Sequence, residues 1–309
     1  MAIRINALTL RDLEYVVAVA ERRHFGQAAA ACHVSQPALS AQVRKVEDAL
    51  GVRLFERTNR RVEVTAIGEQ VAAQARVVLD EAQRLGTVAE RTLGPLVGPF
   101  RLGAIQTVGP YLLPHLLGPL RRAFPRLELE LREGLTADLV RELKAGALDA
   151  VLAAATFTDP AVRQLPLFVE PFQLLAPRGH ALLARRTLHA GDLDARDMLL
   201  LEDGHCLADQ TLDLCPTGRR RGARRVHVTS LETLRHLVAA GGGYTIVPAL
   251  AVTDDRRLRR LVQHRRFDDR VPGRTIVLAT RELLGRTADA GALADLVRSH
   301  LPAQVRPAV

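Results

Sequence analysis

The chain has 309 residues, of which 48% are apolar, enough for two or three domains with cores of their own. Its 43 Lys and Arg against 34 Asp and Glu give a net charge of +9, which favours a polyanionic partner, although an arginine-rich coding bias would raise the charge equally. No run approaches the roughly 20 apolar residues of a membrane span, and the N-terminus lacks the apolar run of a signal peptide. We therefore expect a soluble, cytoplasmic protein with no membrane partner.

The first segment, residues 8–65, is predicted to form three helices and a hairpin. Apolar residues at helical spacing mark the first helix, and an alanine-rich run after Phe25 marks the second. Ser35 is a good N-cap and Pro37 suits a first turn, so the third helix begins there and ends at Gly51.

The third helix keeps a polar face that suits the major groove of DNA, where glutamine and serine read base edges and arginine holds phosphates. Arginines at the tip of the hairpin can enter a minor groove or grip the backbone. The alternative is a small helical domain whose charges are only solvated. The candidate DNA-binding residues are Ser35, Gln36, Pro37, Ser40, Gln42 and Arg44 on the helix and Arg57, Arg60 and Arg61 on the hairpin.

Residues 66–94 are predicted to form one long helix. Apolar residues from Ile67 to Ala89 step by three or four positions, which leaves a narrow seam that is best buried against a second helix. A helix packed on its own domain would show the same seam. Gly94 and Pro95 end the helix in a hinge.

From residue 95 to residue 309 strands and helices alternate, as in a parallel α/β domain. We expect strands at 100–105, 127–131, 148–153, 172–176, 198–201, 226–229, 244–247 and 275–279, and helices at 110–123, 136–146 and 285–301. Two crossing strands would join lobe I, residues 95–169 and 274–309, to lobe II, residues 170–273. Ligands of such sheets bind outside the carboxyl ends of the strands.

Cys206 and Cys215 lie nine positions apart in a chain with only one other cysteine, Cys32. A thiol reacts as its thiolate, and a second thiol nearby can trap the resulting sulfenic acid as a reversible disulfide. The alternative is that both are small core residues, as we expect for Cys32. If the segment between them is helical when reduced, they lie about 13 Å apart, whereas a disulfide spans about 7 Å at most. Forming the disulfide would then require the helix to unwind.

Several motifs, in order and at family spacing, resemble the winged helix-turn-helix of LysR-type transcriptional regulators. They are FGQAA at 25–29, SQPALS at 35–40, EDALGV at 47–52, LFER at 54–57 and TAIG at 65–68. The rest of the chain most closely resembles the OxyR-type peroxide sensors of that family, in TVGPYLLPH at 107–115, LLEDGHCL at 200–207, Cys215, TSLETLR at 229–235, VAAG at 238–241 and PALAV at 248–252. The likeness departs after Cys215, where an arginine-rich loop replaces a generally more acidic one.

The resemblance implies an α/β fold with an N-terminal winged helix-turn-helix, a long linker and dimerisation helix, and a periplasmic-binding-protein-like regulatory domain of two α/β lobes. It implies a transcriptional activator that senses hydrogen peroxide and is not an enzyme. Cys206 would be the peroxidatic cysteine and Cys215 the resolving one, with Thr107, Thr136 and His205 binding peroxide. Two alternatives for single residues stay open: Thr107 as a helix N-cap and His205 in an ordinary structural hydrogen bond.

The resemblance also implies partners: double-stranded promoter DNA, RNA polymerase, hydrogen peroxide, a thiol reductant such as glutaredoxin or thioredoxin, and further copies of the chain in a dimer or tetramer. Neither a cofactor nor a metal is expected, because the sequence has no nucleotide-binding glycine loop and no close metal-ligand spacing. Two other functions compete: a LysR-type regulator of a small organic effector with incidental cysteines, and a thiol peroxidase, which would leave the helix-turn-helix unexplained.

Overall fold

The computed structural model describes residues 8–57, 62–90, 94–215, 224–225, 228–252, 258–268, 273–281 and 287–308. The chain divides into two compact units. The first comprises Met1–Gly94 with Ala145–Ala147, and the second comprises Pro95–Lys144 and Leu148–Val309. No helix among the described residues is both long enough and apolar enough to cross a membrane.

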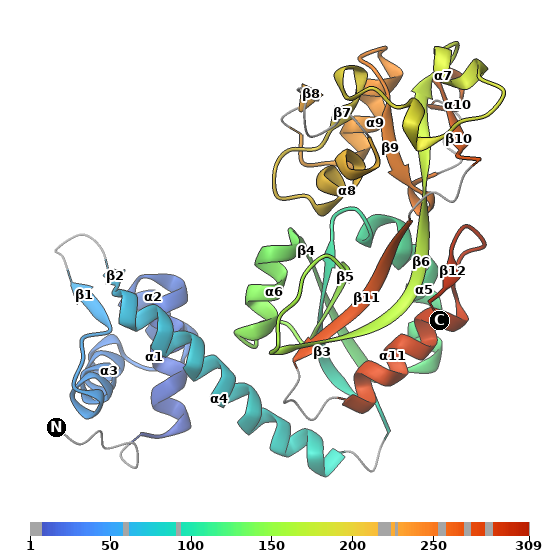
Figure 1. The fold of residues 1–309 in the computed structure, drawn as a ribbon. Coiled ribbons are helices and arrows are strands. Elements are labelled where there is room, and N and C mark those ends of the chain that lie inside the picture. Colours follow the sequence, from blue (N-terminus) through green and yellow to red (C-terminus); the bar gives the residue numbers. More distant parts are fainter. Residues whose placement is uncertain are drawn as a thin grey trace. The chain divides into compact units, whose positions relative to one another are not determined.

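The first unit is built of three short helices, a two-stranded hairpin and one long helix (Figure 1). Its elements are α1 (Leu10–Arg22), α2 (Phe25–Ala31), α3 (Gln36–Leu50), β1 (Phe55–Arg57), β2 (Val62–Val64) and α4 (Ala66–Glu90). As predicted, Ser35 caps α3, accepting a hydrogen bond from the backbone N–H of Ala38 at 3.4 Å, and Gly51 ends it in the left-handed conformation at φ 72°.

The core of this unit is small and continuous. Val16 and Val19 of α1 pack with Leu39 and Val43 of α3, and all four are fully buried. At the end of α3 the buried carboxylate of Glu47 accepts hydrogen bonds from the backbone of the next strand, at 2.7 Å from Leu54 N and 3.1 Å from Phe55 N. The hairpin is therefore fixed to the end of α3, although its tip, with Arg60 and Arg61, lies outside the described residues.

Helix α4 carries some apolar residues that are buried within the first unit and others that remain exposed. Ala72 and Ala75 are buried, and α4 packs against α1. Ile67 and Val78 remain 40% and 38% exposed within the single chain. The predicted seam is thus only partly covered by the protein's own first unit, and its last part, residues 83–90, lies where side chains are not described.

The second unit carries a mixed sheet in the order β10-β6-β11-β5-β3-β4, with β9 and β12 also paired to β6. Its strands are β3 (Gly98–Ile105), β4 (Leu127–Gly134), β5 (Ala150–Ala154), β6 (Val162–Pro177), β7 (Leu199–Leu200), β8 (Arg224–Arg225), β9 (Thr245–Pro248), β10 (Val262–Arg266), β11 (Gly273–Arg281) and β12 (Arg306–Pro307). Its helices are α5 (Gly109–Ala123), α6 (Thr136–Lys144), α7 (Ala181–Ala184), α8 (Cys206–Leu214), α9 (Leu231–Ala239), α10 (Leu258–Leu261) and α11 (Thr287–Ser299).

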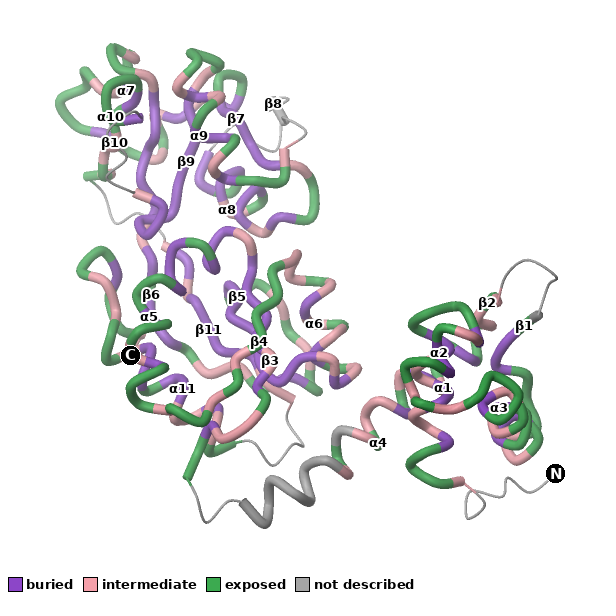
Figure 2. The backbone as a smooth tube through the Cα atoms, turned by 180° about the vertical axis from the view of Figure 1, so that it is seen from behind, coloured by how far each residue is buried: buried purple, intermediate pink, exposed green. Residues whose placement is uncertain are grey.

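Two lobes share this sheet, which confirms the predicted fold class. In lobe I, β3 runs parallel to β4 and β5, and β11 joins β5 in antiparallel orientation. Strand β6 pairs first with β11, over Val162–Pro171, and then with β9 and β10 in lobe II (Figure 1). Figure 2 shows β5 and β9 buried along their whole length, and residues of both strands belong to one apolar core of the second unit.

Some strands differ from the sequence-based prediction. The strand predicted at 172–176 is only the second half of β6, because Pro166 and Pro171 interrupt the apolar pattern of a strand that spans 16 residues. The strand predicted at 198–201 is limited to Leu199–Leu200, where β7 pairs with β8. Of the strand predicted at 226–229, residues 226 and 227 are not described, and residues 228 and 229 are not in a strand.

Candidate functional site

Helix α8 separates the two cysteines of interest. Cys206 is its first residue and is half-buried, whereas Cys215 is its C-cap and is 5% exposed. Both are free thiols. A helical rise of about 1.5 Å per residue places their Cα atoms roughly 13 Å apart, and a disulfide spans about 7 Å at most. The segment between them is helical in the structure, so the condition set by the sequence argument is met, and the two sulfurs bond only if α8 unwinds.

Cys215 is held in the core of lobe II. Its Sγ donates a hydrogen bond to the backbone oxygen of Leu193 at 3.3 Å. Its neighbours Leu212 and Leu214 are buried in the same apolar cluster. Moving Cys215 toward Cys206 breaks this hydrogen bond and takes the thiol out of the apolar core. The arginine-rich loop that follows, residues 216–223, lies outside the described residues.

The segment before Cys206 lies against lobe I. Gly204 has a φ of +96°, and a Cβ on it would stand 3.0 Å from Leu135 Cδ1. A side chain at this position is disfavoured both by the left-handed backbone and by the contact with Leu135. Leu135 directly precedes Thr136, the first residue of α6. The start of α8 therefore meets the start of α6.

Thr107 and Thr136 follow paired residues of neighbouring strands. Ile105 of β3 pairs with Gly134 of β4, and each threonine comes two residues later in its own chain segment. Parallel strands end at the same edge of a sheet, so both threonines lie at the carboxyl edge of lobe I. Together with the contact at Gly204, this places three of the predicted site segments at one edge.

His205 is the N-cap residue of α8 and is only 4% exposed. Burial lowers the pKa of its imidazole, and the nearby charge of Glu202 opposes that shift. The ring is therefore biased toward its neutral form, in which one nitrogen donates and the other accepts. Its Nε2 is buried and has no partner among the described residues, so the alternative of an ordinary structural hydrogen bond finds no support at this nitrogen.

Other buried polar atoms near these segments also lack partners in the described part of the chain. Thr136 Oγ1 is one, Gln106 Oε1 just before Thr107 is another, and Gln210 Oε1, one helical turn after Cys206, is a third. Such atoms are normally satisfied by water or by a ligand. No motif in the sequence distinguishes Gln106 or Gln210 from the other glutamines.

Thr107 has a partner that the sequence did not reveal. Arg274 Nη1 donates to its Oγ1 and Nη2 to its backbone oxygen, both at 2.7 Å. Arg274 also donates through Nε to Glu170 Oε2 at 2.8 Å, in an ion pair whose side chains are fully buried. The alternative of Thr107 as a helix N-cap is wrong, since Val108 holds that position and α5 has no side-chain cap.

A second polar contact joins the lobes. Tyr111 of α5 donates its hydroxyl to Glu232 of α9 at 2.6 Å, and buried Arg235 donates to the same carboxylate at 2.7 Å. The lobes are thus tied by hydrogen bonds close to the carboxyl edge as well as by their crossing strands.

Burial and the charge of Arg235 lower the pKa of His264 on β10 to about 4.

The candidate DNA-binding residues on α3 keep an accessible face. Gln36, Pro37 and Arg44 are exposed, and Ser40 and Gln42 are half-buried. Ser35 is exposed and acts as the cap of the helix. The structure thus brings these six onto one helix, while Arg57 is described only by its backbone and Arg60 and Arg61 are not described. Among the described residues, no cluster of three or more His, Cys, Asp or Glu could hold a metal ion.

The chain matches known families along most of its length. Residues 10–69 match the family described as "Bacterial regulatory helix-turn-helix protein, lysR family", and residues 94–302 match the "LysR substrate binding domain". A "Hydrogen peroxide-inducible genes activator" of Dickeya chrysanthemi is 44% identical, over 95% of this chain and 96% of its own. The "DNA-binding transcriptional dual regulator OxyR" of Escherichia coli K12 is 46% identical, over 81% of this chain and 82% of its own.

Solved structures give the same relationship. A full-length OxyR variant from Pseudomonas aeruginosa is 40% identical, covers 95% of this chain and 98% of its own, and superposes with a TM-score of 0.81. A cysteine mutant of Corynebacterium glutamicum OxyR, bound to H2O2, is 34% identical, covers 94% of this chain and 92% of its own, and gives a TM-score of 0.64. The chain therefore belongs to the LysR family of transcriptional regulators and, within it, to the OxyR group.

Proposed function

We propose that this chain is a DNA-binding transcriptional regulator that senses hydrogen peroxide through oxidation of Cys206 and a disulfide between Cys206 and Cys215. The observation that carries the proposal is the position of the two thiols at opposite ends of α8, with buried polar atoms beside the first of them that have no partner among the described residues. A related protein that binds H2O2 in a solved structure supports the same assignment.

The start of α8 suits an anionic sulfur. The first N–H groups of a helix lack partners within the helix, and the helix dipole places partial positive charge there. Cys206 is the first residue of α8 and is reachable from solvent, being half-buried. Cys215, at the negative end of the same dipole and in the core, has neither advantage. This asymmetry assigns Cys206 as the first thiol to react.

The chemistry balances with two thiols and one peroxide. The thiolate of Cys206 attacks one oxygen of the peroxide, an S–O bond forms, and the O–O bond breaks. The departing hydroxide takes up a proton and leaves as water. The thiol of Cys215 then attacks the sulfenic sulfur, so that an S–S bond forms and a second water leaves. The two cysteines lose two electrons and two protons, and peroxide is reduced to two waters.

Buried hydroxyl and imidazole groups would orient the peroxide. Thr136 can both donate and accept through its hydroxyl, as can the neutral ring of His205 through its two nitrogens. The contribution of Thr107 is narrower: its Oγ1 already accepts from Arg274, which leaves the hydroxyl hydrogen free to donate. Through Thr107 the buried ion pair of Arg274 and Glu170 is linked to this edge.

Oxidation would be read out as a change of shape. Bringing the sulfurs within bonding distance requires α8 to unwind and Cys215 to leave Leu193. A segment with two alternative packings, biased by a covalent bond, is a switch. We propose that this change alters contacts between regulatory domains of a dimer or tetramer and so repositions the DNA-binding domains. A thiol reductant such as glutaredoxin or thioredoxin would reset the switch.

The first unit would hold promoter DNA. Gln36, Ser40 and Gln42 would read base edges in the major groove, while Ser35 and Pro37 set the start of α3. Arg44, with Arg57, Arg60 and Arg61 of the hairpin, would hold phosphates or enter the minor groove. Two copies joined through α4 would match two half-sites, and RNA polymerase would be the downstream partner.

The test uses the reduced full chain and DNA selected by it from a random pool. Stoichiometric peroxide should change the DNA footprint of the wild type and of the control Cys32→Ser, and it should leave the footprint of Cys206→Ser unchanged. In Cys215→Ser, Cys206 should reach the sulfenic acid, but no intramolecular disulfide should form. A Cys206→Ser protein that still changes its footprint would refute the assignment.

A further inference from the structure

The thiol of Cys215 rests on one peptide group of lobe II. Its Sγ donates to the backbone oxygen of Leu193 at 3.3 Å, and both residues are buried. The carbonyl of Leu193 belongs to the same planar peptide group as the backbone N–H of Asp194. Whatever holds this peptide group therefore also holds the acceptor of the Cys215 thiol.

Tyr244 binds the other side of the same peptide group. Its hydroxyl oxygen accepts from the backbone N–H of Asp194 at 2.7 Å and donates to the backbone oxygen of Asp194 at 2.8 Å. In a trans peptide the C=O and the N–H point in opposite directions. The hydrogen bond from Cys215 to Leu193 and the one from Asp194 to Tyr244 thus polarise the peptide group in the same sense, so that each strengthens the other.

The backbone of Tyr244 fixes the far end of the same segment. Its N–H donates to the backbone oxygen of Asp197 at 3.0 Å, and its carbonyl accepts from Leu199 N at 2.7 Å. Gly243 has a φ of +135°, and a Cβ on it would clash with the backbone oxygen of Asp197. Because these contacts are made by the backbone, they do not depend on the phenol, and Tyr244→Phe isolates the contribution of the hydroxyl.

The side chain of Tyr244 is itself fixed in the core. It is 1% exposed, and the ring of His180 meets it edge-on with the ring centroids 5.4 Å apart. Burial raises the pKa of the Tyr244 hydroxyl, the hydrogen bond from the Asp194 backbone opposes this shift, and the charge of a Cys215 thiolate adds to it. The phenol therefore keeps the proton that it donates to Asp194, and it lies within electrostatic range of Cys215.

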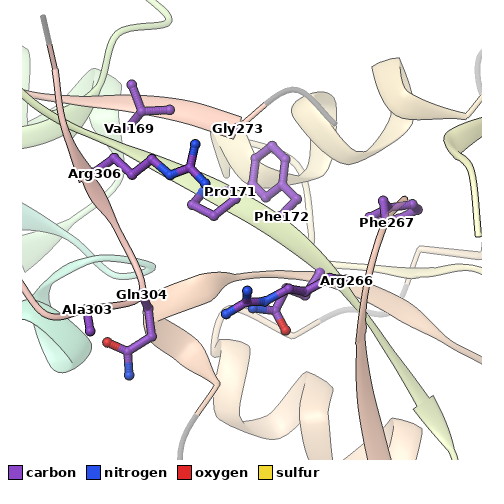
Figure 3. A pocket seen from close by; sticks show the side chains of 10 residues that line it. Val169, Pro171, Phe172, Arg266, Phe267, Gly273, Ala303, Gln304 and Arg306 are labelled. Atoms are coloured by element: carbon purple, nitrogen blue, oxygen red, sulfur yellow. The ribbon is translucent and has the colours of Figure 1, made fainter. Parts of the chain in front are cut away.

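A pocket of about 640 Å³ at the crossing of the lobes, lined by the side chains drawn in Figure 3, does not reach this place. Cys215, Leu193 and Tyr244 are not among the described residues that line it. Because Cys215 is also buried, we expect a reagent in solvent to meet its thiol when lobe II opens locally and Cys215 leaves Leu193.

We propose that Tyr244 positions the resolving thiol: its hydroxyl holds the peptide group between Leu193 and Asp194, and this group holds Cys215 in the reduced chain. The inference rests on the disulfide between Cys206 and Cys215 proposed above. Forming that disulfide gives up the contact with Leu193. Interactions that strengthen the contact therefore stabilise the reduced state and raise the reduction potential of the couple. Tyr244 thereby sets how readily the disulfide forms.

The first measurement needs no peroxide. In a full chain carrying Cys32→Ser and Cys206→Ser, Cys215 is the only remaining thiol. The rate at which iodoacetamide labels it, followed by intact mass, reports how often it leaves its resting place. We expect Tyr244→Phe to speed this labelling about tenfold, the usual effect of losing a buried hydrogen bond.

Thr245→Val in the same chain is the matched control. It removes a buried hydroxyl of the neighbouring residue, which donates to the backbone oxygen of Leu199 at 2.7 Å, and it should label like the parent. Labelling of Tyr244→Phe at the parental rate would overturn the inference. An equal rise in Thr245→Val would also overturn it, because general loosening of lobe II would then explain both rates.

The second measurement is the reduction potential of the disulfide in a chain that keeps Cys206 and Cys215. We expect Tyr244→Phe to favour the disulfide about tenfold, which lowers the potential by about 30 mV for a two-electron couple. The rate of sulfenic acid formation at Cys206 should stay that of the wild type. An unchanged potential would contradict the inference. A wild-type chain that forms no disulfide would instead refute the proposed function, and the labelling rates would still decide whether Tyr244 holds Cys215.

Discussion

Arg274 donates hydrogen bonds to both the hydroxyl and the backbone oxygen of Thr107, each at 2.7 Å, and so fixes the turn that follows β3. Replacing Thr107 by valine removes one acceptor from a fully buried guanidinium. We expect the free energy of unfolding to fall by about 1–3 kcal/mol, the usual cost of a buried donor left without a partner. Urea denaturation measures this, and Thr107→Ser, which keeps the hydroxyl, is the control. A Thr107→Val protein as stable as the wild type would show that Arg274 does not need this acceptor.

Thr136 offers the cleaner test of the peroxide pocket. Its Oγ1 is buried without a partner among the described residues, so Thr136→Val should change the free energy of unfolding by less than about 1 kcal/mol. We expect the same change to slow sulfenic acid formation at Cys206 about tenfold, because one hydrogen bond to the reacting peroxide is lost. Stopped-flow oxidation at limiting peroxide gives the rate. An unchanged rate in a stable variant would remove Thr136 from the site.

His264 makes stability depend on pH. Its pKa is lowered from 6.5 to about 4 by burial, with a contribution from Arg235. Below pH 6.5 the unfolded chain takes up a proton that the folded chain does not accept until about pH 4, so the free energy of unfolding decreases as the pH falls through this window. The difference between the two pKa values corresponds to about 3 kcal/mol.

The measurement is urea denaturation at several pH values between 4 and 8. His264→Gln should lose less stability than the wild type between pH 6.5 and 4, and the pH dependence of the two proteins should become parallel near pH 8, where the imidazole is neutral in both states. Identical slopes through the acidic window would contradict the assignment.

Substitutions on helix α3 should have two separable effects on DNA binding. Arg44→Ala should weaken binding to all sequences and reduce the slope of log affinity against log salt by about 0.9, the loss of one phosphate contact. Gln36→Ala should instead relax base preference at one position, by about 1–3 kcal/mol of discrimination. Fluorescence anisotropy over a salt series distinguishes them. If Arg44→Ala leaves the salt slope unchanged, Arg44 does not touch the duplex.

The helix ends of the first unit could be predicted from local sequence signals. Ser35, Pro37 and Gly51 mark the ends of α3 because capping is a property of a few neighbouring residues, and the structure confirms them. The helix between Cys206 and Cys215 was only a condition of the sequence argument, and the structure shows that it is present. The family resemblance assigned Thr107, Thr136 and His205 to one peroxide-binding site, and that assignment stays a prediction.

Long-range contacts could not be predicted in the same way. Arg274 and Glu170 are 104 residues apart, and Arg274 and Thr107 are 167 residues apart, so no local sequence pattern indicates the buried Arg274–Glu170 ion pair or its contact with Thr107. Strand β6 was predicted only in part, since prolines at 166 and 171 hide its period and its partners on β11 lie 102 to 119 residues away along the chain.

Peptide mapping of the wild-type chain after stoichiometric peroxide tests the central claim most directly. We expect the intact mass to fall by two hydrogen atoms and the digest to contain one disulfide-linked peptide pair joining Cys206 to Cys215, with Cys32 still free, and a thiol reductant to restore the original mass. An intramolecular disulfide that includes Cys32, or a Cys206 that stays reduced while the DNA footprint changes, would contradict the account.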